Sequence, residues 1–135
     1  MTQQNKIIIL WQLYLFGMVF HTLIALMPIF FGASVAIESA NGVMPESIGW
    51  KLLVFLVLPM ICITVSLFTN AKWHRLSNLV VASLFTLASL MHLINDGGSS
   101  IFQAILLSYV LIVTILLTWV SYGRFRQNSE ESISQ

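Results

Sequence analysis

Charge is what this sequence has least of. Only 8% of its 135 residues are Asp, Glu, Lys or Arg, whereas 58% are hydrophobic; ordinary soluble domains carry roughly 25% and 45–50%. A soluble chain of this length exposes too much surface for so few charges to cover. The formal net charge of +1 gives no basic surface of the kind that binds nucleic acid. The composition therefore argues against an ordinary soluble domain and against a nucleic-acid partner, and it favours a lipid environment.

Cysteine and catalytic motifs are equally scarce. Cys62 is the single cysteine, so the chain has no intramolecular disulfide and no CxxC metal motif. It lies within an apolar run, which is typical of a small buried packing residue. The sequence contains no nucleophile elbow, Walker loop or zinc-protease helix. These absences lead us to expect a protein without enzymatic activity.

Four long apolar runs dominate the chain. Residues 7–37, 52–71, 76–95 and 97–123 contain no Asp, Glu, Lys or Arg. Each run is as long as the roughly 20 residues that an α-helix needs to cross about 30 Å of hydrocarbon. We therefore expect one all-α domain over residues 1–135, folded as a four-helix transmembrane bundle.

Turn-forming and polar residues between the runs set the expected boundaries. Helices are expected at about 7–34, 51–70, 76–96 and 100–122, and a polar, disordered tail is expected at 127–135. The apolar region of the first helix is too long for a signal peptide, so this helix is expected to be retained. Pro28 is expected to kink the helix near its far end, because proline removes a backbone donor.

The basic residues are distributed unevenly between the two ends of the predicted bundle. With four helices, both termini and the connection at 70–76 fall on one side. That side carries five of the six basic residues, namely Lys6, Lys72, Arg75, Arg124 and Arg126, and the other side carries Lys51. The positive-inside rule then predicts both termini in the cytoplasm, for a multi-pass protein of a bacterial-type plasma (inner) membrane. His74, within the basic connection, is expected to contact anionic lipid headgroups.

The most polar stretch within or beside the apolar runs is His-Leu-Ile-Asn-Asp at 92–96, which ends at a Gly-Gly turn. On a helix, His92, Asn95 and Asp96 share one face, because they are three and four residues apart. An imidazole at membrane depth with an amide and a carboxylate one turn away is a candidate functional site. Asn95 and Asp96 are therefore candidates for the mouth of a substrate or proton pathway.

Counting residues along each helix brings a second histidine to the same level. His21 and His92 both lie roughly 21–22 Å from the cytoplasmic entry of their helices, at 1.5 Å per residue. Ser108 and Tyr109 of the fourth helix fall at roughly 20–21 Å and complete the candidate pathway. Stripes of small and hydroxyl residues include His21 and His92 and mark faces where neighbouring helices approach closely. Both imidazoles are therefore expected to point into the bundle.

Two inward histidines lead to three hypotheses. In the first, His21 and His92 are polar packing residues that hydrogen-bond to each other or to nearby hydroxyl groups. In the second, they bind a b-type haem or a metal ion between the first and third helices through neutral imidazole nitrogens. In the third, they form part of a proton relay or of a pocket for a lipophilic substrate.

The leading expectation for function is a small, non-enzymatic accessory or structural subunit of the inner membrane. The alternatives are a haem- or metal-binding membrane redox protein that uses His21 and His92, and a small transporter or channel for protons, ions or a lipophilic solute. The lipid bilayer is the expected partner. Small residues on the helix faces are also compatible with a homodimer or a larger membrane complex.

Overall fold

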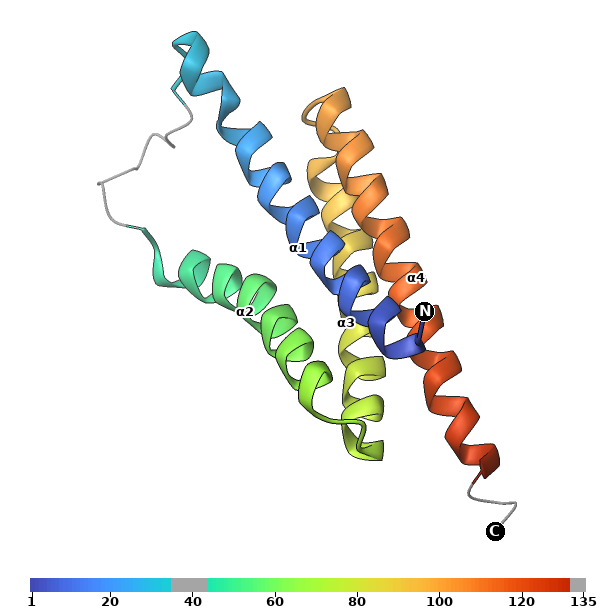
Figure 1. The fold of residues 1–135 in the computed structure, drawn as a ribbon. Helices are drawn as coiled ribbons and strands as arrows, with labels where there is room; N and C mark the ends of the chain where they lie inside the picture. The colour runs from blue at the N-terminus through green and yellow to red at the C-terminus, as the bar shows by residue number, and fades with distance from the viewer. Residues whose placement is uncertain (35–43, 132–135) are drawn as a thin grey trace.

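The computed structural model describes the backbone of residues 1–34 and 44–131 and the side chains up to residue 126. The helices are α1 Gln3–Leu26, α2 Glu46–Phe68, α3 Lys72–Asp96 and α4 Ile101–Glu131, with a short 3-10 helix, η1 Met27–Phe31, directly after α1 (Figure 1). Four spans are long and apolar enough to cross a membrane. The prediction of an all-α chain with four such helices is confirmed.

The helices extend further at their polar ends than the apolar runs predict. α1 begins at Gln3 rather than at about 7, α2 at Glu46 rather than 51, and α3 at Lys72 rather than 76, while α4 continues past 122 to Glu131. Helical hydrogen bonding does not stop where the apolar run stops; Thr2, for example, accepts from the Asn5 N–H and caps α1. The loop over 35–43 and the last four residues of the tail lie outside the described residues.

The interruption predicted at Pro28 is present. α1 ends at Leu26, and the chain continues as η1 with Pro28 at its start. Because proline has no backbone N–H, the regular α-helical bonding pattern cannot continue through it, and a tighter turn takes its place. Gly32 then ends η1 with a φ of 80°, a left-handed conformation that glycine adopts without steric cost.

α1, α3 and α4 form the closely packed part of the bundle, and α2 diverges from it (Figure 1). Both α1 and α3 pack along α4. The buried residues of α2 are Pro59, Cys62 and Ser66, all in its second half and spaced three and four residues apart on one face. The first half of α2 is therefore only loosely attached to the other three helices.

An aromatic cluster joins α2 to the bundle. The rings of Trp11, Tyr14 and Phe85 meet edge to face, with centroids 5.3–5.9 Å apart. Phe55 of α2 joins them, with its centroid 5.6 Å from that of Phe85. Edge-to-face pairs of this kind add about 0.5–1.5 kcal/mol each beyond the burial of their area. The cluster thus marks the point beyond which α2 separates from the bundle.

Polar contacts gather the helix ends at what we call the basic end, formed by the start of α1, the α2–α3 connection and the end of α4. Arg124, only 6% exposed, donates from Nη2 to the side-chain oxygens of Gln4 and Asn70. Gln4 in turn donates to the backbone carbonyl of Ser66. These three segments therefore lie together, at the end of the bundle opposite to the α3–α4 turn.

The prediction for His74 is wrong. Its side chain is 3% exposed, and its Nε2 lies 2.9 Å from the hydroxyl oxygen of Ser66. The error arises because α3 begins at Lys72, so that the residue assigned to a basic loop already lies on a packed helical face. His74 joins α3 to α2 and is not available to lipid headgroups.

Candidate functional site

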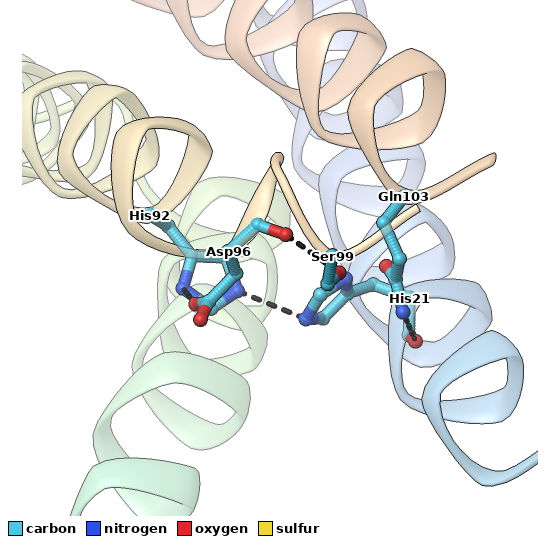
Figure 2. Close-up of polar contacts among 5 residues, drawn as sticks. All are labelled: His21, His92, Asp96, Ser99 and Gln103. Carbon is cyan, nitrogen blue, oxygen red and sulfur yellow. Dashed lines mark hydrogen bonds and ion pairs between the residues drawn. The ribbon is translucent and has the colours of Figure 1, made fainter. Parts of the chain in front are cut away.

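His21 of α1 and His92 of α3 meet close to the α3–α4 turn, which defines the histidine end of the bundle. Their Nε2 atoms are 3.0 Å apart, and the ring planes are inclined at 73° with centroids separated by 4.7 Å (Figure 2). Gly17, one helical turn before His21, allows the close approach of α1 to Val110 of α4. The depth count that paired the two histidines is consistent with this contact.

Asp96 extends the contact into a chain of three side chains. Its Oδ2 lies 2.9 Å from Nδ1 of His92, one turn earlier on α3, and the two side chains are 50% and 35% exposed. The Ser99 hydroxyl donates to the backbone carbonyl of Asp96 at 2.7 Å and caps the end of the helix there (Figure 2). Asp96, His92 and His21 therefore form one continuous hydrogen-bonded series, which begins at an exposed carboxylate.

The donors and acceptors in this series follow from the carboxylate. An ionised Asp96 only accepts, so Nδ1 of His92 carries the proton between them. In a neutral His92 the other nitrogen, Nε2, is then an acceptor. The donor across the 3.0 Å contact must be Nε2–H of His21, which leaves Nδ1 of His21 without a proton. A single arrangement of protons thus satisfies both contacts of the series.

Gln103 of α4 lies at the buried end of the series. It is 5% exposed, and its Nε2 donates to the backbone carbonyl of His21 at 3.4 Å. Within the described part of the chain, Nδ1 of His21 and Oε1 of Gln103 are both buried and lack a hydrogen-bond partner. The two atoms are complementary, because a protonated Nδ1 is a donor and an amide oxygen is an acceptor.

Ser108 and Tyr109 do not join this site. Both lie on the exposed face of α4: the Ser108 hydroxyl donates to the Ala104 carbonyl of its own helix at 2.7 Å, and Tyr109 is 44% exposed. The prediction has the right level but the wrong side of the helix. Polar side chains occur on both faces of α4, with Gln103, Thr114 and Ser121 on the buried face and Ser108 and Tyr109 on the exposed one, so polarity alone did not identify the inward face.

A cavity of about 300 Å³ adjoins the histidine pair. All four helices contribute to its wall: Tyr14 from α1, Lys51 and Phe55 from α2, Ser89, His92 and Asn95 from α3, and Leu107 from α4 are among its lining residues. Of the predicted pathway residues, Asn95 thus lines the cavity rather than the hydrogen-bonded series. Sequence reasoning missed Lys51, Tyr14 and Ser89 as site residues, although Tyr14 and Ser89 lie on the faces predicted to point inward.

The positions of the two histidines do not fit a haem between them. Metal–imidazole bonds of about 2.0–2.1 Å would place two axial nitrogens on opposite sides of a metal about 4 Å apart, with a porphyrin between the rings. The Nε2 atoms are 3.0 Å apart and in direct contact. No group of three or more His, Cys, Asp or Glu side chains that could hold a metal ion occurs within the residues that the structure describes.

A scan against protein-family models, a search of curated proteins and a search of solved structures each found no match to this chain.

Proposed function

We propose that the chain is a multi-pass protein of a bacterial-type plasma membrane, with both termini in the cytoplasm. Four span-length helices support insertion into a bilayer. Large apolar side chains point outward from several helices, among them Phe16 at 63%, Leu84 at 59% and Phe102 at 69% exposure, and a surface of this kind suits lipid better than water. The basic end carries Lys6, Lys72, Arg75, Arg124 and Arg126, which supports placing it in the cytoplasm.

Within this membrane protein, the Asp96–His92–His21 series acts as a proton relay, and the chain serves as a small proton-linked transporter. The observation that carries this proposal is the unbroken pair of contacts at 2.9 and 3.0 Å, from an exposed carboxylate to a half-buried imidazole whose Nδ1 atom is buried. Ionisable groups paired inside a membrane-spanning bundle commonly mark proton pathways. The broader interpretation as an accessory subunit has no comparable contact to support it.

The relay moves a proton by two coupled shifts. A proton that arrives at Nδ1 of His21 releases the proton of its Nε2 to Nε2 of His92. His92 then releases its Nδ1 proton to the carboxylate of Asp96, which is the exposed end of the series. One proton enters at the buried end and one leaves at the surface, and both rings change tautomer. The reverse sequence carries a proton inward.

Proton flux into proteoliposomes that contain a trapped pH-sensitive dye tests the relay. A potassium gradient with valinomycin drives the flux, and the same vesicles without protein give the background. We expect a flux that changes between about pH 5 and 8, the range in which histidine usually titrates. Because proton transfer by a positioned group contributes about 10²–10⁴-fold to a rate, Asp96→Asn and His21→Gln should each lower the flux at least tenfold.

Tyr109→Phe is the matched control, because Tyr109 lies at the same level but on the exposed face of α4. It should retain the flux of the unaltered protein. Flux equal to that of empty vesicles, flux independent of pH, or equal losses in all three variants would each contradict the relay. The first of these outcomes would instead support the accessory role.

A further inference from the structure

The cavity beside the histidine pair contains polar groups whose hydrogen bonds are not made within the protein. Six helical Ser and Thr hydroxyls donate to the carbonyl four residues earlier, at 2.7–3.1 Å: those of Thr22, Thr64, Ser77, Ser83, Thr86 and Ser108. Ser89 lines the cavity and is only 8% exposed, yet its hydroxyl has no hydrogen bond within the residues that the structure describes. A hydroxyl that is accessible from the cavity and has no partner in the chain can donate to a molecule bound there.

Tyr14 repeats the pattern on the opposite wall. It is 1% exposed and lines the same cavity, and its hydroxyl likewise makes no hydrogen bond to any described residue. A phenol hydroxyl can donate one hydrogen bond. Two largely buried residues that line the cavity, one from α1 and one from α3, therefore each carry a hydroxyl without an acceptor among the described residues.

Lys51 of α2 adds a positive charge to the same wall. It has no ion pair within the described ranges 1–34 and 44–126, where the one ion pair joins His92 and Asp96. Lys51 lies one helical turn from Phe55, and Ser89 lies one turn from Phe85, which Phe55 contacts. The ammonium group and the Ser89 hydroxyl thus belong to the same level of the cavity, above the aromatic cluster.

We propose that this cavity binds an amphipathic monocarboxylate. The carboxylate accepts hydrogen bonds from Tyr14 and Ser89 and pairs with Lys51, and an unbranched apolar tail lies along Phe55 and Leu107. A carboxylate fits because the free groups are two donors and one cation. About 300 Å³ is at the lower limit of ligand-pocket volumes, which run to about 1,000 Å³, so one short tail is accommodated and a two-chain phospholipid is not.

The proposal deepens the proposed function by naming the class of solute, but it rests on the cavity alone. Both nitrogens of His92 are already engaged, one by Asp96 and one by His21. His92 therefore contributes the side of its ring to the wall and no hydrogen bond to the ligand. His21 does not line the cavity. His21→Gln should thus abolish the relay and leave ligand binding in place, which separates failure of one proposal from failure of the other.

Binding of radiolabelled decanoate to the full-length protein in lipid nanodiscs tests the site, with 1-decanol as the neutral probe of equal tail length. Empty nanodiscs give the background partition of both probes. Hydrogen bonds and ion pairs to a charged acceptor typically account for about tenfold or more in affinity. We therefore expect Lys51→Met to weaken decanoate binding about tenfold, and Tyr14→Phe and Ser89→Ala to weaken it several-fold, with little effect on decanol.

Two further variants make the outcome decisive. Ala88 lines the cavity, so Ala88→Trp should block both probes while the protein stays monodisperse, and Lys51→Arg should restore decanoate binding by keeping the charge. Equal binding of decanoate and decanol, or decanoate binding unchanged in Ala88→Trp and Lys51→Met, would overturn the proposal. Displacement of decanoate by a higher phosphatidylglycerol content would overturn it too, because the occupant would then be an acyl chain of the bilayer.

Discussion

Asn78 is the residue whose replacement tests most directly how this bundle is held together. Its Oδ1 accepts from Nε1 of Trp11 at 2.9 Å, and its Nδ2 donates to the hydroxyl of Ser121 at 2.9 Å. The three side chains are 2%, 0% and 1% exposed and come from α3, α1 and α4. One amide therefore joins all three helices of the closely packed part. Asn78→Ala removes both bonds at once.

The expected loss of stability follows from those two bonds. A buried hydrogen bond contributes about 0.5–1.5 kcal/mol net, so two contribute about 1–3 kcal/mol. The Trp11 N–H is then left buried without an acceptor, which adds part of a further penalty of about 1–3 kcal/mol. We expect Asn78→Ala to lower the free energy of unfolding by about 2–4 kcal/mol. Within membrane bundles, individual pairs usually contribute less, about 0.6 and at most about 1.7 kcal/mol.

A double-mutant cycle isolates the contact between Trp11 and Asn78. Unfolding of Trp11→Phe, Asn78→Ala and the double variant is followed by circular dichroism as sodium dodecyl sulfate replaces a mild detergent. We expect a coupling energy of about 0.6–1.7 kcal/mol. Trp119, 78% exposed, supplies the control, because Trp119→Phe combined with Asn78→Ala should be additive. A Trp11–Asn78 coupling below about 0.3 kcal/mol, within the usual error of additivity, would refute this account of the core.

Two other predictions concern helix packing and topology. Gly17→Ala would place a Cβ 2.5 Å from Cγ2 of Val110, whose β-branched side chain adjusts poorly, so we expect a loss of about 1–3 kcal/mol in the same unfolding assay. Gly123→Ala meets open space within a helix and should instead be neutral or stabilising by up to about 1 kcal/mol. A reporter that is active only in the cytoplasm should give a signal when it is fused after residue 135, and a reporter that is active only in the periplasm should not. A signal from the periplasmic reporter would overturn the assignment of the basic end to the cytoplasm.

The number of helices could be predicted from the four long apolar runs of the sequence. An uncharged run of about 20 residues has few alternatives to a spanning helix, and the chain has four such runs. Boundaries were less accurate, because polar residues such as Gln3 and Lys72 continue a helix beyond its apolar part. The same boundary shift explains the error at His74. A residue a few positions from the end of an apolar run lies either in a loop or on a packed helical turn, and composition alone does not decide between them.

The candidate site was only partly predictable, for a different reason. Helical spacing placed His21 and His92 at one level and Asp96 on the same face as His92, and these residues are in contact. The inward side of α4 could not be found in this way, so Ser108 and Tyr109 were assigned to the site in place of Gln103. The cavity could not be predicted from the sequence either. It depends on the divergence of α2, which is a tertiary property that no local pattern encodes.

The relay and the cavity, although separable by mutation, share the ring of His92, and this shared residue is how the two proposals would combine in one transporter. A proton on the histidine pair adds a positive charge beside the cavity, and a bound carboxylate adds a negative one. Each then favours the other, by the same factor in both directions, because coupling between two binding equilibria is reciprocal. Asp96 affects the strength of this coupling. While its carboxylate is ionised and accepts the hydrogen bond from Nδ1–H of His92, its negative charge next to the ring opposes binding of the carboxylate ligand. When the relay delivers a proton to Asp96, that opposing charge is removed. Under the two proposals together, protonation of Asp96 would favour binding of an anionic solute in the cavity, and loss of that proton would weaken the binding again.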